Sequence, residues 1–163
     1  MSTGGMGQQA GFTFIELAIT VAIVALLATI ALPMAELTVK REQEHELRLA
    51  LREIRSALDA YKRAVDEGRI ATSLGKSGYP ASLKEMVEGV TDERSPDRNT
   101  KIYFLRHIPR DPMFPDPAAA DDDTWGKRSY ASGADAPAEG DDVFDVYSLA
   151  SDMGLNGIPY RNW

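Results

Sequence analysis

Cysteine is absent from this 163-residue chain. Its absence excludes disulfides, thiolate catalysis and zinc sites with cysteine ligands. Histidine is scarce, since only His45 and His107 occur, and there is no glycine-rich phosphate loop. These gaps leave no catalytic constellation, so the sequence predicts a protein that is not an enzyme. An exported small domain without disulfides must gain its stability from its core, a long helix or a bound metal.

Positive charge is also in short supply. The chain has 18 basic and 25 acidic residues, a net charge of -7. A nucleic-acid-binding surface needs clustered positive charge to displace phosphate counterions. The balance therefore argues against a nucleic-acid partner and is compatible with a surface that binds cations.

Charged side chains are missing altogether from residues 17–35, a run of 19 residues. A helix needs about 20 predominantly apolar residues to cross the hydrocarbon core of a bilayer. The run therefore predicts a transmembrane helix. Glu16 lies directly before it, and a carboxylate at the centre of a spanning helix costs about 2.5 kcal/mol or more, which calls for a functional explanation.

The sequence GFTFIE at residues 11–16, followed by an apolar helix that contains Pro33, resembles the type IV pilin and pseudopilin family. The resemblance implies that a prepilin peptidase removes the leader, residues 1–11, by cutting after Gly11. It implies that the new terminal residue, Phe12, is methylated. Glu16 would pair with the terminal amine of a neighbouring subunit, and Pro33 would bend the helix.

Two other interpretations of this region are an uncleaved signal anchor and a secretory signal peptide. A secretory signal has a basic start and small residues after its apolar stretch. Here residues 1–11 hold no lysine or arginine, although pilin leaders are usually basic, and Gly11 precedes the apolar run. For Glu16 alone, the alternative is a carboxylate that lies at the water interface.

Beyond the apolar run, the sequence predicts that the same helix continues through residues 36–67. Gly68 then supplies a stop. A helix over residues 12–67 would be about 80 Å long, with its first half in lipid and its second against a globular domain. Six apolar residues recur at three- and four-residue steps and predict one buried face: Leu47, Leu51, Ile54, Leu58, Tyr61 and Val65.

The remainder, residues 69–163, predicts a small region with one short helix and a few strands. Ser82 and Glu85 form a capping-box pattern for the helix. Residues 127–132 and 143–148 are typical of strands, with Phe144 and Val146 on the face that packs against the long helix. Residues 91–101 indicate an exposed turn, and residues 113–124 a mobile loop. The fold class is α+β: a long N-terminal helix packed on a small antiparallel sheet, as in type IV pilins.

Within the family, the chain resembles most the major (G-type) pseudopilins. The resemblance rests on the absent cysteines and on three short elements, Tyr79-Pro80, Trp125-Gly126 and Asn162-Trp163. It implies domains at residues 1–11 (leader), 12–35 (spanning segment), 36–68 (amphipathic continuation) and 69–163 (globular region).

The same resemblance implies a Ca²⁺ site after the last strand. Its ligands would be the Leu149 carbonyl, the Asp152 carboxylate and Asn156. Calcium takes six to eight oxygen ligands, and the family's glycine-rich loop and closing aspartates have no counterparts here. The alternative is an ordinary solvated acidic surface.

Three functions fit these observations. The first is a structural subunit of a type II secretion pseudopilus, a helical homo-oligomer in the periplasm with a single inner-membrane span. Its partners would be the prepilin peptidase, other pseudopilins and inner-membrane secretion assembly proteins. The second is a type IV pilus or minor pilin subunit in adhesion, motility or DNA uptake. The third is a monomeric membrane-anchored binding domain in which Glu16 has no role.

Overall fold

A computed structural model describes residues 13–97 and 99–163, with residues 30–33 described by their backbone alone. The predicted cleavage and methylation positions, Gly11 and Phe12, lie outside the described residues.

Helix α1 runs over Phe14–Asp66. The chain divides into two compact units within this helix: the first ends at Lys40 and the second begins at Arg41. Helix α1 confirms the single long helix predicted for residues 12–67. The helical backbone continues through Pro33, and the bend predicted there stays a prediction.

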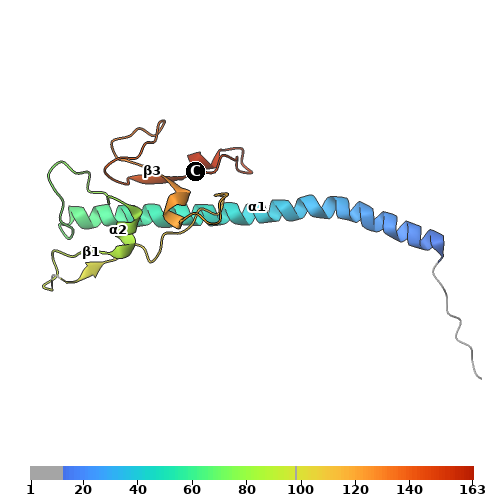
Figure 1. Ribbon diagram of the computed structural model, residues 1–163, viewed down its shortest axis with the longest axis horizontal. Helices are drawn as coiled ribbons and strands as arrows, with labels where there is room; N and C mark the ends of the chain where they lie inside the picture. The colour runs from blue at the N-terminus through green and yellow to red at the C-terminus, as the bar shows by residue number, and fades with distance from the viewer. Residues whose placement is uncertain (1–12, 98) are drawn as a thin grey trace, which may run out of the picture. The chain divides into compact units, whose positions relative to one another are not determined.

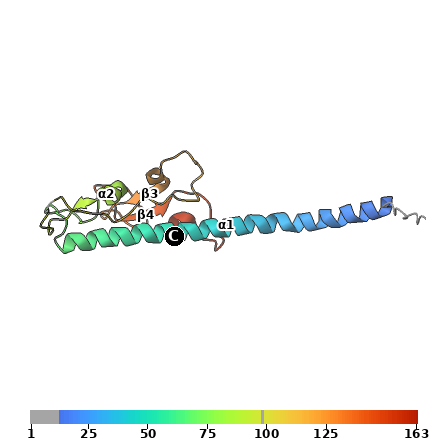
Figure 2. The same cartoon turned by 90° about the horizontal axis from the view of Figure 1, so that it is seen from below.

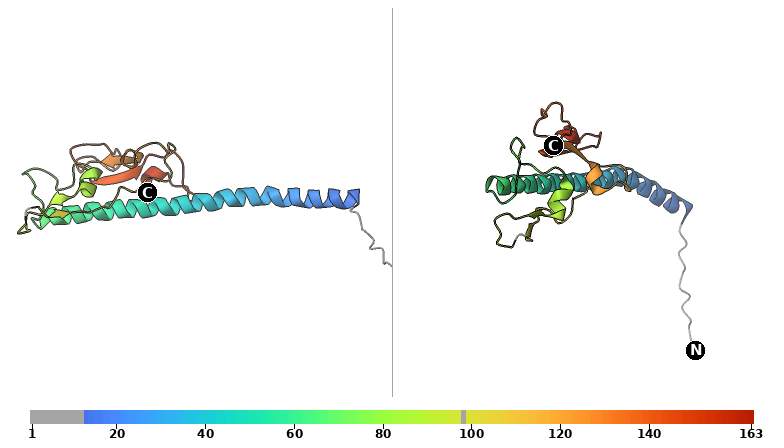
Figure 3. Two further views of the ribbon diagram at one scale, coloured as in Figure 1. Left: turned by 60° about the horizontal axis from the view of Figure 1, so that its bottom comes forward. Right: turned by 60° about the vertical axis from the view of Figure 1, so that its left-hand side comes forward.

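In the second unit, one face of α1 forms the base of the hydrophobic core. The predicted apolar face is confirmed, because Leu47, Ile54 and Leu58 are at most 1% exposed and the other three members are also buried. Figure 1 shows α2, the strands and the C-terminal segment along this part of α1. Figure 2 and the left view of Figure 3 show that they gather on one side of it.

Gly68 ends α1, as predicted. Its φ of +70° lies in the left-handed region that glycine adopts without strain. The Gly68 N–H donates to the Val65 carbonyl (2.8 Å) and the Arg69 N–H to the Ala64 carbonyl (2.9 Å). This pair of bonds is a Schellman motif, which satisfies carbonyls left open by the last turn.

The second helix, α2, spans Leu83–Glu88 and begins at the predicted cap. The Ser82 hydroxyl accepts from the Glu85 N–H (3.4 Å), while the Glu85 carboxylate accepts from the Ala81 N–H (2.9 Å). In a standard capping box the glutamate accepts from the N–H of the cap residue itself. Here Glu85 accepts instead from the N–H of Ala81, one residue before the cap Ser82. Glu85 also accepts from the Tyr61 hydroxyl (3.1 Å), which ties α2 to α1.

A two-stranded antiparallel sheet follows α2. Strand β1 (Val90–Thr91) pairs with β2 (Lys101–Ile102). The ends of the segment predicted as an exposed turn, residues 91–101, therefore belong to a hairpin. Strands of two residues are too short to show the alternation by which a strand is recognised in a sequence.

The second sheet pairs β3 (Trp125–Arg128) with β4 (Asp145–Ser148) in antiparallel register. The strand predicted at residues 127–132 corresponds to β3, which begins two residues earlier, at Trp125, and ends at Arg128. The chain turns there because the Asp142 carboxylate accepts from the Ser129 hydroxyl (2.9 Å) and the Tyr130 N–H (2.8 Å).

The buried face of β4 also differs from the prediction. Val146 and Ser148 are fully buried, whereas Phe144 lies before the strand and is only partly buried. Its ring packs edge-on against Tyr79 (5.0 Å between centroids) and Tyr130 (5.4 Å). Phe144 therefore belongs to an aromatic cluster beside the sheet and not to the face that covers α1.

Asp111 is a fully buried acid beneath the second sheet. Its Oδ2 accepts from the Ser148 hydroxyl (2.5 Å) and its Oδ1 from the Met113 N–H (2.8 Å). Its own N–H donates to the Thr124 hydroxyl (3.1 Å) in η1 (Asp121–Thr124). Burial raises the pKa of Asp111, partly offset by these hydrogen bonds. Both ends of the predicted loop 113–124 are thereby hydrogen-bonded to the buried Asp111.

Candidate functional site

The start of α1 is organised by a hydrogen-bonded pair, Thr13 and Glu16. One Glu16 carboxylate oxygen accepts from both the Thr13 N–H and the Thr13 hydroxyl, each at 3.1 Å. The Thr13 hydroxyl accepts from the Glu16 N–H (3.3 Å). This is a capping box, T-x-x-E, which satisfies donors that the first turn leaves open. The sequence prediction missed Thr13, although the spacing that identified the cap at Ser82 recurs here.

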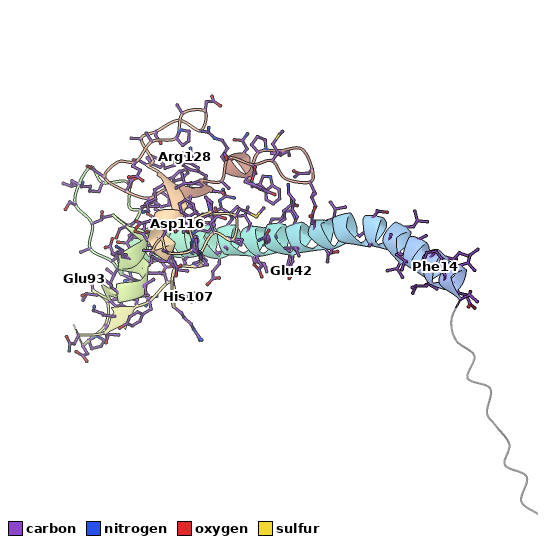
Figure 4. All side chains as sticks on the ribbon, turned by 45° about the vertical axis from the view of Figure 1, so that its right-hand side comes forward. Phe14, Glu42, Glu93, His107, Asp116 and Arg128 are labelled. Atoms are coloured by element: carbon purple, nitrogen blue, oxygen red, sulfur yellow. The ribbon has the colours of Figure 1, made fainter. Side chains whose placement is uncertain are left out.

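The first unit carries an apolar surface that the chain itself leaves uncovered. Figure 4 shows Phe14 at the beginning of α1, where its side chain is 88% exposed. The side chains of nine further apolar residues are also exposed: Ile15, Leu17, Ile19, Val21, Ile23, Val24, Leu26, Leu27 and Met34. A large apolar patch that is exposed in a single chain marks a surface that is covered by lipid or by protein. Within the described residues, α1 is the helix with the length and composition to cross a membrane.

The two predicted functional regions lie in different units. Glu16 belongs to the unit that ends at Lys40, whereas Leu149, Asp152 and Asn156 belong to the unit that begins at Arg41.

The calcium site suggested by the family resemblance stays a prediction. Leu149, Asp152 and Asn156 are exposed, and the Asn156 side-chain oxygen already accepts from the Ile158 N–H (3.0 Å). Within the part of the chain that the structure describes, no group of three or more His, Cys, Asp or Glu side chains is placed to hold a metal. Calcium takes six to eight oxygen ligands, and the resemblance names groups on only three residues, Leu149, Asp152 and Asn156.

Glu44 of α1 binds the C-terminal segment, residues 149–163, and the sequence analysis did not predict this role. Glu44 is 3% exposed. Its Oε1 accepts from the Leu155 N–H (2.6 Å) and from the Tyr160 hydroxyl (3.1 Å). Burial, strengthened by the bond to Glu44, raises the pKa of Tyr160. The signal in the sequence is helical spacing, because Glu44 lies three residues before the buried Leu47 on the core face.

One of the short elements behind the G-type resemblance, Trp125-Gly126, has a structural role. The Trp125 indole N–H donates to the Pro109 carbonyl (2.7 Å), and Gly126 faces the Tyr147 ring. A Cβ at Gly126 would come within 2.3 Å of that ring. These residues therefore shape the second sheet.

The histidines are far apart in the chain and take part in no described catalytic group. His45 is exposed on α1. His107 lies in the loop after β2, and Figure 4 shows its side chain pointing away from the core.

Comparison with known proteins agrees with the arrangement at the start of α1. Residues 6–32 match the family described as "Prokaryotic N-terminal methylation motif". A protein of Pseudomonas aeruginosa strain PAO1, "Type II secretion system core protein G", is 28% identical over 153 residues. The match covers 89% of this chain and 85% of that protein.

The chain carries this methylation motif and is similar over most of its length to that secretion-system protein. Pilins and pseudopilins are structural proteins, and an N-terminal apolar helix fits a membrane-anchored one. No solved structure matches the chain at a significant level.

Proposed function

We propose that this chain is a structural subunit of a type II secretion pseudopilus, which polymerises through the first part of α1 to support export of folded proteins. The apolar surface around Phe14–Met34 carries the proposal, because it is exposed in a single chain and needs lipid before assembly and neighbouring helices after it. The similarity to a protein named as a secretion-system core component favours this function over a pilus in adhesion, motility or DNA uptake.

The proposal includes processing and location. A prepilin peptidase would cut after Gly11 and methylate Phe12, so the chain is the substrate of an enzyme and not itself one. The span would lie in the bacterial inner membrane with the second unit in the periplasm. Other pseudopilins and inner-membrane assembly proteins would be its partners.

Glu16 is the residue that assembly would depend on. Cleavage frees a positive amine at Phe12, and a neighbouring subunit's Glu16 would meet it away from water. Two opposite charges about 4 Å apart attract by about 4 kcal/mol at an effective dielectric constant of about 20. The capping box offers a competing explanation, because the same carboxylate binds Thr13 within its own chain.

Three variants separate these two roles. Glu16→Gln keeps an oxygen for Thr13, since glutamine serves in capping boxes, but it removes the charge. Glu16→Ala removes both, and Glu36→Ala is a control at an exposed acid farther along α1. We expect all three to be inserted and processed, but only the control to form filaments, as judged by electron microscopy and by mass spectrometry of the amino terminus.

Normal filaments from Glu16→Gln but not from Glu16→Ala would show that the cap matters and the charge does not. Normal filaments from both would refute a role of Glu16 in assembly and favour the monomeric anchored domain.

A further inference from the structure

Glu44 is a buried acid, and buried charges need partners. A carboxylate removed from water without compensation costs far more than a hydrogen bond returns. Glu44 meets this cost with the Leu155 N–H at 2.6 Å and the Tyr160 hydroxyl at 3.1 Å, which both point to Oε1. Both donors come from the C-terminal segment, residues 149–163, so the carboxylate joins α1 to that segment.

The second Glu44 oxygen faces a cation of the same helix. The Arg48 guanidinium lies 3.6 Å from Oε2, one turn later on α1. The guanidinium carbon is also 4.1 Å from the centroid of the Trp163 ring, a cation–π distance. Trp163 in turn packs edge-on against Tyr160, with 5.0 Å between ring centroids. The four side chains form a closed cluster.

The backbone of the segment is closed by its own hydrogen bonds. The Tyr160 N–H donates to the Asp152 carbonyl (3.2 Å), and the Gly154 N–H to the Ile158 carbonyl (2.9 Å). Arg55 of α1 adds a bond to the Trp163 carbonyl (2.9 Å). The Asn156 side-chain oxygen, one of the suggested calcium ligands, likewise already accepts from the Ile158 N–H (3.0 Å).

We propose that Glu44 and Arg48 take the place of a bound cation in this chain. The guanidinium supplies the positive charge beside the carboxylate, and the carboxylate supplies the acceptor that holds residues 149–163 against α1. A calcium ion bound at the Glu44 carboxylate would be repelled by the Arg48 guanidinium, which lies 3.6 Å from Oε2. The second unit accordingly closes its C-terminal segment without calcium, in contrast to the site that the family resemblance implied. This inference does not depend on the secretion function.

The first test compares the full chain in detergent micelles with millimolar calcium chloride and with a chelator. Hydrogen exchange of residues 149–163 and melting followed by tryptophan fluorescence are the two measurements. We expect both to be the same in the two buffers. Slower exchange in this segment or a higher melting temperature with calcium would overturn the proposal.

The second test removes the carboxylate. In Glu44→Ala, the Leu155 amide should exchange about ten-fold faster or more, the change expected for losing one hydrogen bond to a charged group. Glu46→Ala, at an exposed acid on the same helix, should leave this exchange unchanged. Wild-type exchange in Glu44→Ala would overturn the proposal.

Global unfolding of Glu44→Ala would be recognised by lost protection in α2 and the first sheet. Arg48→Met then decides the matter, because the Arg48 side chain is 44% exposed and its replacement leaves no buried cavity. Faster exchange confined to residues 149–163 supports the proposal. Unchanged exchange in Arg48→Met overturns the part assigned to the guanidinium.

Discussion

Replacing Asp111 by alanine should destabilise the second unit strongly. The change leaves the Ser148 hydroxyl and the Met113 N–H without their acceptor. A buried group without a partner costs about 1–3 kcal/mol, so the two together predict a loss of about 3 kcal/mol. At about 4 °C per kcal/mol for a unit of this size, the melting temperature should fall by about 12 °C.

Asp111→Asn is the matched variant, because its amide oxygen still accepts from Met113 and its amide nitrogen can donate to the Ser148 oxygen. Its loss of unfolding free energy should be about 1 kcal/mol or less.

The two variants also differ from wild type in their response to acid. Burial raises the pKa of Asp111 above its usual value of 3.8, so the folded protein binds this proton more tightly than the unfolded one. Ionised Asp111 therefore lowers stability at neutral pH.

As the pH falls through the raised pKa of Asp111 towards 3.8, wild type should gain stability relative to Asp111→Asn. The assay is urea unfolding of the full chain in micelles, followed by tryptophan fluorescence, because both tryptophans, Trp125 and Trp163, lie in the second unit. An unchanged free energy of unfolding in Asp111→Ala, or a difference in this free energy between wild type and Asp111→Asn that is constant with pH, would refute this reasoning.

Two further changes test the fold. Gly89→Ala should cost about 1–3 kcal/mol, because Gly89 has a φ of +79° that is strained for alanine, whereas Gly133→Ala, with nothing within 4 Å of its added Cβ, should be neutral in the same melting assay. Arg69→Met should flatten acid unfolding, because the hydrogen bond from Arg69 lowers the pKa of Asp92 below 3.8. The stability from this pair is present above 3.8 and is lost as the pH falls through the lowered pKa. Equal acid profiles for wild type and Arg69→Met would contradict the pairing.

The sequence was sufficient for the elements whose signal is local and periodic. The repeat from Leu47 to Val65 spans five turns, and Gly68 marks its end. The cap at Ser82 likewise needs only neighbouring residues. Such features follow from helix geometry alone, which is why the prediction and the structure agree on them.

Features that depend on distant residues escaped prediction. Strand β3 begins at Trp125 because its partner is Ser148, and nothing near Trp125 specifies that register. Glu44 resembles any charged helix residue until Leu155 and Tyr160 are placed beside it. The calcium ligands were inferred from the family pattern and stay a prediction, whereas the contacts of Glu44 could be found only from the structure.

The contacts of Glu44 also set an order of events during synthesis. Its two partners lie 111 and 116 positions later in the chain, and chains are made from the amino terminus. While the ribosome is still adding the last strand, α1 is complete, but its apolar face has no cover. Closure of such distant contacts is slow. During that interval Glu44 and Arg48 face water as ordinary charged side chains, and they keep one end of the uncovered helix soluble until the segment that will bury them has been made.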